Sequence, residues 1–247
     1  MNEVMNVTVI GAGSWGTALA LLLVRKGHSV ELIGRNHSML ESLIHHKENR
    51  HYLQGFMLPD TLTFSSLEKI SASSDCYVVA VPSDKVHEVL PYLPKQDALI
   101  VIASKGLIEG SFIFLSRFVQ TELPGAKIAV LSGPNLAVEL AREIPSAAVA
   151  ASSDSEVSKK VASIFRTPFY RVYTSLDLIG VELAGALKNI YAIGAGLSDG
   201  LGFGDNTKAT LLARGLHEMV RLGVLMGAHF ETFMGGCRCG RSFCNSK

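Results

Sequence analysis

Three glycines near the N-terminus have the spacing of a loop that holds a phosphate group. Gly11, Gly13 and Gly16 directly follow a β-branched apolar run at residues 7–10, and an apolar helical stretch begins at Thr17. In this order of strand, turn and helix, the first glycine permits a tight turn and the second lets the backbone approach a pyrophosphate. The third allows helix and strand to pack closely, and the helix N-terminus offers free amides to the phosphates. The pattern predicts a dinucleotide site.

The end of the next predicted strand bears on the choice of dinucleotide. Residues 29–33 form a strand pattern that ends in Gly34, Arg35 and Asn36. A site for NADH places an acidic residue there to bind the ribose hydroxyls, whereas a guanidinium can pair with the 2′-phosphate of NADPH. Arg35 therefore favours NADPH over NADH. The alternative, a solvated surface arginine, stays open on the sequence alone.

Further strand patterns continue along the first part of the chain. Apolar runs at residues 76–81, 98–103 and 127–131 end in small residues or proline, and helical stretches at residues 84–93 and 111–122 lie between them. Alternating strands and helices predict an α/β fold of the Rossmann type, doubly wound around a largely parallel sheet. Ligands of such sheets bind beyond the carboxyl ends of the strands.

Lys105 stands at one of these strand ends, between Ser104 and Gly106. The neighbouring strand ends, at residues 81–83 and 132–134, carry small residues and proline, so they leave room for a ligand. Lys105 is therefore a candidate for binding an anionic substrate or a cofactor phosphate. An ordinary surface lysine is the alternative, which the position beside a glycine at a strand end weakens.

The second part of the sequence changes to long helical stretches, at residues 178–195 and 206–225. We divide the chain into a dinucleotide-binding domain at residues 1–177, the start of a helical substrate and catalytic domain at 178–234, and an aberrant tail at 235–247. The expected fold is thus a Rossmann-type sheet followed by an incomplete all-helical domain.

Lys188 lies in the first helical stretch, among small and apolar residues. Loss of hydration lowers the pKa of a lysine and makes it usable as a general base near neutral pH. The spacing alone favours the other interpretation, a lysine whose amine reaches the surface.

Composition bounds the class of protein. The chain has 247 residues, 48% of them hydrophobic and 18% charged, which is the balance of a soluble globular protein. A net charge of +1 provides no field to gather nucleic acid or anionic lipid, so a small-molecule partner is expected. The N-terminus has no leader pattern, and no apolar run approaches the length of a bilayer span, so we expect a cytoplasmic protein. Cys237, Cys239 and Cys244 lack the spacing of a structural zinc site, and no metal site is expected.

Several longer motifs, read together, resemble a known family. They are GAGSWGTALA, VELIGRN, VAVPS, IASKGL, LSGPNLAVE, GVELAGALKNIYAIGAGLSDGLGFGDN and LLARGLHEM. From Met5 to about Met234 the chain resembles bacterial NAD(P)-dependent glycerol-3-phosphate dehydrogenase. The resemblance implies hydride transfer between NADPH or NADH and the dihydroxyacetone phosphate/glycerol 3-phosphate pair, in the direction of phospholipid synthesis. It also implies a homodimer for full-length members.

The resemblance assigns roles to individual residues. Ser14, Trp15 and Arg35 would bind the dinucleotide together with the three glycines, and Ala137 would close over it. Lys105 would contact both cofactor and substrate. Gly133, Asn135 and Asn189 would lie beside the substrate, although the family usually has serine at the position of Asn135. Lys188 matches the catalytic lysine of the family.

The last residues depart from the family. Members continue with a Gly-Leu-Ala-Gly-x-Gly-Asp-Leu segment and a Ser-Arg-Asn motif that contact substrate and cofactor, and neither stands after Gly235. Codons for residues 237–246, taken from the second base, allow Ala-Gly-Val-Gly-Asp-Leu-Phe-Val-Thr-Ala. We therefore interpret the tail as frameshifted sequence and expect a truncated chain with impaired activity. The alternative function is a catalytically silent dinucleotide-binding protein.

Overall fold

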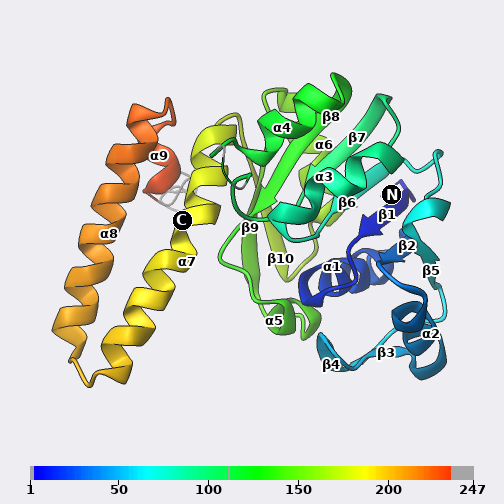
Figure 1. The fold of residues 1–247 in the computed structure, drawn as a ribbon, viewed down its shortest axis with the longest axis horizontal. Coiled ribbons are helices and arrows are strands. Elements are labelled where there is room, and N and C mark those ends of the chain that lie inside the picture. The colour runs from blue at the N-terminus through cyan, green and yellow to red at the C-terminus, as the bar shows by residue number, and fades with distance from the viewer. Residues whose placement is uncertain (1–2, 109, 111, 235–247) are drawn as a thin grey trace, which may run out of the picture.

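The computed structural model describes residues 3–108, 110 and 112–234. They form an α/β layer structure followed by a helical hairpin that stands beside it (Figure 1). Eight strands make the main sheet, in the order β10-β9-β8-β7-β6-β1-β2-β5. Their bounds are β1 Asn6–Ile10, β2 Ser29–Gly34, β5 Leu62–Ser66, β6 Cys76–Val79, β7 Gln96–Ile102, β8 Gly125–Ser132, β9 Ser146–Ala151 and β10 Tyr170–Ser175.

The sheet is parallel except at one junction. Only β8 and β9 pair in antiparallel fashion among the described strands of this sheet. The predicted Rossmann-type, largely parallel sheet is thereby confirmed. A separate two-stranded hairpin, β3 Glu48–Asn49 and β4 Leu53–Met57, lies outside it.

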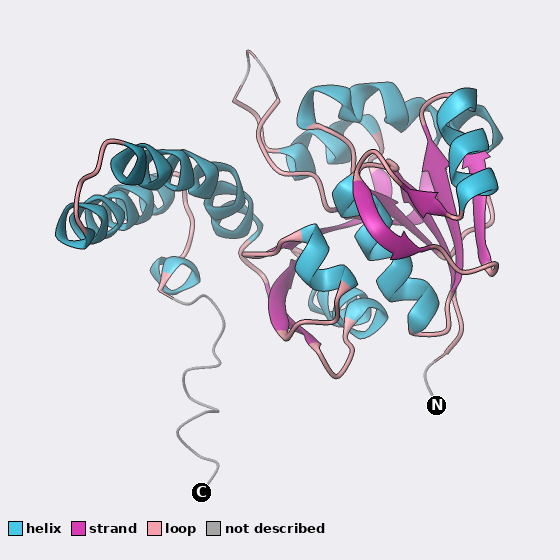
Figure 2. Cartoon of the chain, turned by 90° about the horizontal axis from the view of Figure 1, so that it is seen from below, coloured by secondary structure: helices cyan, strands magenta, loops and turns pink. Residues whose placement is uncertain are grey.

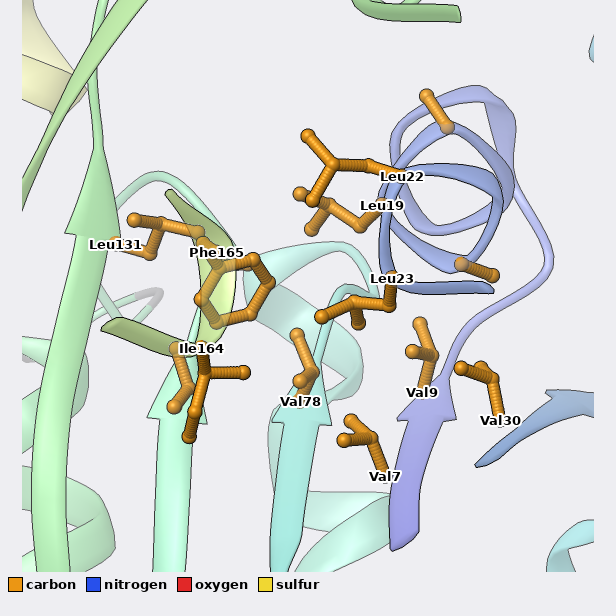
Figure 3. Close-up of a cluster of buried hydrophobic side chains, with 14 of the residues drawn as sticks. Val7, Val9, Leu19, Leu22, Leu23, Val30, Val78, Leu131, Ile164 and Phe165 are labelled. Atoms are coloured by element: carbon orange, nitrogen blue, oxygen red, sulfur yellow. The ribbon is translucent and has the colours of Figure 1, made fainter. Parts of the chain in front are cut away.

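Helices cover both faces of the sheet (Figure 2). Alternation of side chains along each strand supplies the two apolar faces, because successive residues point to opposite sides. In β6, Val78 packs on the face that carries α1 Ser14–Arg25 and α6 Ser155–Phe165, whereas Tyr77 and Val79 pack on the other. Figure 3 shows the first face, where Leu19, Leu22 and Leu23 of α1 meet Val7, Val9 and Val78 of the strands and Ile164 and Phe165 of α6.

The opposite face corrects one predicted helix. Residues 84–93 do not form a single helix but a 3₁₀ turn at Ser83–Lys85, α3 at Val86–Val89 and a second 3₁₀ turn at Leu90–Tyr92. Pro91 explains the break, since it lacks an amide proton and its ring disfavours a continuous α-helix before it. The described helix α4 on this face spans Leu115–Glu122. The other described α-helices of this part are α2 His37–His46 and α5 Ala137–Ala141, and a further 3₁₀ turn spans Leu67–Lys69.

The helical hairpin consists of α7 Leu178–Gly200 and α8 Asp205–Leu225, followed by the short α9 Phe230–Phe233. Asp177 begins α7 as its N-cap, because its carboxylate accepts a hydrogen bond of 2.8 Å from the amide of Gly180. The same carboxylate accepts bonds from the amide of His229 and the hydroxyl of Thr232, at 2.9 and 2.5 Å. One aspartate therefore fixes both the start of α7 and the position of α9.

One expectation about hydrophobic runs was too strict. Among the described residues, α7 is long and apolar enough to cross a membrane by length and composition alone. It has 23 residues, and an 18-residue window within it has a mean hydropathy of 1.3. It carries Glu182 and Lys188 in its interior, and charged groups are costly in a bilayer. Here α7 packs Leu183 against Met219 and Val220 of α8.

Candidate active site

The glycine loop has the geometry that its three glycines predict. Gly11 has φ +114°, and a Cβ atom there would lie 2.6 Å from the carbonyl oxygen of Ala80. A Cβ atom on Gly16 would overlap the carbonyl oxygen of Gly11, so only glycine lets α1 approach the turn so closely. A Cβ atom on Gly13 would meet nothing within 4 Å. The loop is thus tight at both ends and open in the middle.

The N-terminus of α1 follows this open position. Gly13 is the N-cap residue, and no side chain caps the first turn. Ser14 is exposed and Trp15 half-buried, and the indole nitrogen of Trp15 is buried without a hydrogen-bond partner among the described residues. Uncapped amides at a helix start, next to an open glycine, fit the pyrophosphate of a dinucleotide.

Lys105 reaches the loop from the segment after β7, which β6 separates from β1 in the sheet. Its Nζ atom lies 5.4 Å from the centre of the Trp15 ring, within the range of a cation–π contact. The preceding Ser104 anchors the end of β7, because its hydroxyl donates a hydrogen bond of 2.6 Å to the carbonyl of Val81. The structure therefore holds Lys105 beside the glycine loop and not on a free surface.

Lys188 projects from α7 toward the end of β8. Its Nζ atom donates a hydrogen bond of 2.5 Å to the carbonyl of Gly133. Burial, and after it the positive charge of Lys105 and a hydrogen bond with that side chain, lower the pKa of Lys188 to about 7. The surface position that spacing alone favoured for this amine is wrong, and the two lysines are brought together from opposite parts of the chain.

A cavity of about 460 Å³ lies next to Lys188. Its wall is made by the end of β8 with Gly133 and Pro134, by residues of β9, by α7 and α8, and by α9 through Phe233. Gly185 allows α7 to approach, because a Cβ atom there would lie 2.7 Å from the hydroxyl of Ser132. Lys188 follows one turn later on α7, so the close approach at Gly185 brings the amine to the cavity wall.

Comparison with known proteins decides the family. Residues 6–158 match the family model described as NAD-dependent glycerol-3-phosphate dehydrogenase N-terminus, and residues 177–245 match the model of its C-terminus. The chain belongs to the NAD-dependent glycerol-3-phosphate dehydrogenase family. The match to the C-terminal model runs past Met234, where the motifs end. The tail at residues 235–247, with its three cysteines and the predicted frameshift, lies outside the described residues, and the frameshift stays a prediction.

Relatives and a solved structure agree with this assignment. The glycerol-3-phosphate dehydrogenase [NAD(P)+] of Desulfitobacterium hafniense is 45% identical, with 93% of this chain and 66% of the relative covered. That of Syntrophomonas wolfei is 46% identical, covering 93% of this chain and 69% of the relative. The crystal structure of glycerol-3-phosphate dehydrogenase from Coxiella burnetii superimposes with a TM-score of 0.88 at 39% identity, covering 94% and 72% of the two chains. The chain thus spans about two thirds of the length of the curated relatives it matches.

The structure gathers some of the predicted family residues and leaves others apart. Gly133 lines the cavity, and a Cβ atom there would lie 2.7 Å from Oδ1 of Asn135 and 2.8 Å from the carbonyl of Ala147. The side chain of Asn135 donates a bond of 2.9 Å to that same carbonyl and accepts one of 3.3 Å from the hydroxyl of Tyr170. Its polar atoms therefore hold β9 and β10 in place.

Three further predicted residues lie away from the cavity wall. Asn189 is exposed, Ala137 starts α5 and packs on the core beneath α1, and Arg35 is exposed directly after β2. The exposure of Arg35 is compatible with either interpretation of this side chain. Its charge contributes to lowering the pKa of Glu88, after the larger effect of Lys85.

Sequence reasoning missed Glu182, a buried carboxylate that joins α7 to the sheet domain. Its oxygens accept hydrogen bonds from the amide of Ser116, at 2.9 Å, and from the Ser116 hydroxyl. They cap α4, whose own N-cap residue Phe114 offers no side-chain bond. Burial raises the pKa of the Glu182 carboxyl, and the bonds from Ser116 and Leu115 oppose that rise. An acid inside the apolar run GVELAGAL is the signal that could have revealed it.

Asn49 was also missed. It is buried in the small hairpin and contacts the glycine loop. No pattern around residue 49 indicates this contact, because the loop is far away in sequence. Among the described residues, no group of three or more His, Cys, Asp or Glu side chains is placed to hold a metal ion.

Proposed function

We propose that the chain reduces dihydroxyacetone phosphate to sn-glycerol 3-phosphate with NADPH or NADH. The observation that carries the proposal is the cavity beside Lys188, where this amine lies close to Lys105 and Lys105 lies over Trp15 of the glycine loop. The proposed cofactor site and the proposed general acid are thereby adjacent. The names of the relatives support the same reaction.

Lys188 would serve as the acid in this reaction. When bound, the reduced nicotinamide supplies the hydride that reaches C2 of the ketone. Negative charge then grows on the ketone oxygen, and the ammonium of Lys188 stabilises that charge and donates the proton. A pKa of about 7 suits both directions, because the same amine accepts the proton when glycerol 3-phosphate is oxidised.

Charge at the site favours a phosphorylated substrate. Lys105 is one of the causes that lower the pKa of Lys188, so the two amines carry unfavourable positive charge when both are protonated. A phosphate dianion would offset that repulsion. Its binding would raise the pKa of Lys188 and so keep the amine protonated for the reductive step.

Arg35 favours NADPH as the reductant. It follows β2 directly, at the sheet edge where the ribose of a dinucleotide binds in Rossmann-type folds. The proposal places the protein in the cytoplasm, in the supply of glycerol 3-phosphate for phospholipid synthesis. A homodimer, as in full-length members of the family, is part of the same proposal.

Turnover and binding together test the function. The parent chain should oxidise NADPH in the presence of dihydroxyacetone phosphate, followed by absorbance of the reduced nicotinamide. Lys188→Ala should lower kcat by about a hundredfold to ten-thousandfold while changing the Kd for NADPH less than about threefold, because the amine acts on C2. Lys159→Ala is the matched control, since Lys159 is an exposed lysine paired with Glu156 on α6.

Two results would contradict this assignment. Normal kcat in Lys188→Ala would remove the proposed acid. NADPH binding by the parent without any turnover of dihydroxyacetone phosphate would support the catalytically silent dinucleotide-binding protein instead.

A further inference from the structure

We propose that Asn49 is a positioning residue that holds the glycine loop in the conformation that binds the dinucleotide. The proposal rests on the proposed function in one respect, that the loop binds a dinucleotide. It adds a residue from a separate hairpin, 32 positions away from Thr17 in the sequence.

The contacts of Asn49 join the glycine loop to the first turn of α1. Its Nδ2 atom donates a hydrogen bond of 2.9 Å to the carbonyl of Ala12 and another of 2.8 Å to the hydroxyl of Thr17. Its Oδ1 atom accepts a bond of 3.2 Å from the amide of Tyr52 in its own hairpin. Both donor positions of the amide group are used, and the residue is 2% exposed.

The bond to the carbonyl of Ala12 fixes the orientation of the peptide group that joins Ala12 to Gly13. A trans peptide is planar, and its carbonyl and amide point in opposite directions. With the carbonyl of Ala12 directed to Asn49, the amide proton of Gly13 points away from Asn49. Gly13 is the open position of the loop and the N-cap residue of α1, so this amide belongs to the donors available to a phosphate.

Glycine makes such a restraint necessary. Gly11 and Gly13 flank Ala12, and glycine has the largest conformational freedom of any residue. Without a fixed partner for the carbonyl of Ala12, the peptide between Ala12 and Gly13 can rotate away from its binding orientation. Binding a dinucleotide would then have to order it, which weakens affinity.

The chain itself provides the probe for the test. Trp15 is the only tryptophan in the sequence, and it stands in the first turn after Gly13. Titration of the parent with NADPH should change the emission of Trp15 and give a Kd without any turnover. Activity of the enzyme is therefore not needed as a readout.

Asn49→Asp is the informative variant. It keeps the shape and the acceptor for the amide of Tyr52, but turns a carboxylate oxygen toward the carbonyl of Ala12. We expect the Kd for NADPH to rise about tenfold, the effect of about one or two hydrogen bonds. The ratio of variant to parent Kd should fall again as the pH is lowered from about 8 to about 6, because a protonated Asp regains a donor.

Ser152→Ala is the matched control for lost stability. Ser152 is also buried in the sheet domain, and its hydroxyl donates a bond of 2.6 Å to the carbonyl of Ile128 in β8, which β7 and β6 separate from β1. This variant should lower the melting temperature and leave the Kd for NADPH within about twofold of the parent. Should Asn49→Asp not fold, Thr17→Val, which removes the second acceptor, should raise the Kd severalfold in its place.

The outcomes separate the inference from the proposed function. A parent that does not bind NADPH overturns both, because no dinucleotide is left to position. A parent that binds, with an unchanged Kd in the folded Asn49→Asp variant or in Thr17→Val, overturns the role of Asn49 alone. An equal rise in Ser152→Ala would show general destabilisation and would also overturn it.

Discussion

The sheet domain and the helical hairpin bury their apolar side chains to different extents. In α1, eight of twelve residues are buried, and Leu19, Leu21 and Leu23 are completely inaccessible to solvent. In the distal half of α7, Ile190, Ile193 and Leu197 are 60%, 73% and 62% exposed. The sheet domain therefore has a closed core of its own, whereas the hairpin draws its packing from the few residues near Asp177 and Phe233.

The two regions also carry different parts of the proposed function, cofactor binding and catalysis. The dinucleotide loop, Lys105 and Asn49 lie within the closed core domain, so cofactor binding depends on well-packed structure. Lys188 is placed by α7, which contacts the sheet domain through Gly185 and Glu182. Elements with few buried contacts open locally at lower free energy than core elements. Catalysis should accordingly be more sensitive than cofactor binding to changes in the hairpin.

The largest expected effect tests the contrast in packing directly. Leu23→Ala should lower the free energy of unfolding by about 2–5 kcal/mol, since it leaves a cavity in a close-packed core. Ile193→Ala should change it by less than about 0.5 kcal/mol, because that side chain is mostly exposed. Urea unfolding curves of the two variants give both values. Similar losses would mean that the distal hairpin is covered in solution.

The same contrast explains what the sequence could predict. Strands β1, β2, β6, β7 and β8 were predicted because β-branched residues run through them, and the glycine loop because three glycines have fixed local roles. Strand β9 has the composition SAAVAA, and alanine has little strand propensity, so no local signal marks it. Pro91 is the local signal for the break in the helix predicted at residues 84–93.

The candidate site was predictable only where motifs carry it. The resemblance to the family singled out Lys188 and Lys105, although residue spacing alone favoured a surface position for Lys188. Glu182 and Asn49 act through contacts with Ser116 and Ala12, residues more than 30 positions away in the chain. Contacts between residues so far apart produce no periodic pattern in the sequence. The roles of Glu182 and Asn49 could therefore be recognised only from the structure.

A smaller effect is expected at the junction of the two regions. Glu182→Ala leaves the amide and hydroxyl of Ser116 without their acceptors and should lower the free energy of unfolding by about 2 kcal/mol. It should also lower kcat more than the affinity for NADPH, because α7 carries Lys188 and not the dinucleotide loop. Parallel measurement of kcat and of the Kd from Trp15 emission checks this. A loss confined to cofactor affinity would contradict it.

The pH dependence of stability is a second test of Glu182, the residue that joins α7 to the sheet domain. Burial raises the pKa of Glu182 above its ordinary value of 4.5, so the folded state holds this proton more tightly than the unfolded state. The protonated Glu182 carboxyl therefore contributes to the stability of the fold. This contribution is fully present below the pKa of the group in the unfolded chain, and it is lost as the pH rises through the pKa in the folded protein. Urea midpoints of the parent and Glu182→Gln should therefore converge at low pH and separate toward neutrality, with the parent the less stable.

The smallest expected effect lies within the sheet domain alone. Arg35→Ala should raise the Kd for NADPH by about tenfold, the loss of one charge-assisted contact with the 2′-phosphate, and leave the Kd for NADH nearly unchanged. Because the change does not involve the hairpin, it should have the same size in a Lys188→Ala background, as expected for distant and independent sites. Titration of Trp15 emission with each nucleotide, in the parent, the two single variants and the double variant, gives the eight constants. An equal loss for NADPH and NADH would contradict the contact with the 2′-phosphate, and an unchanged Kd for both would make Arg35 a solvated surface residue. A loss that disappears in the Lys188→Ala background would show that the hairpin takes part in cofactor binding.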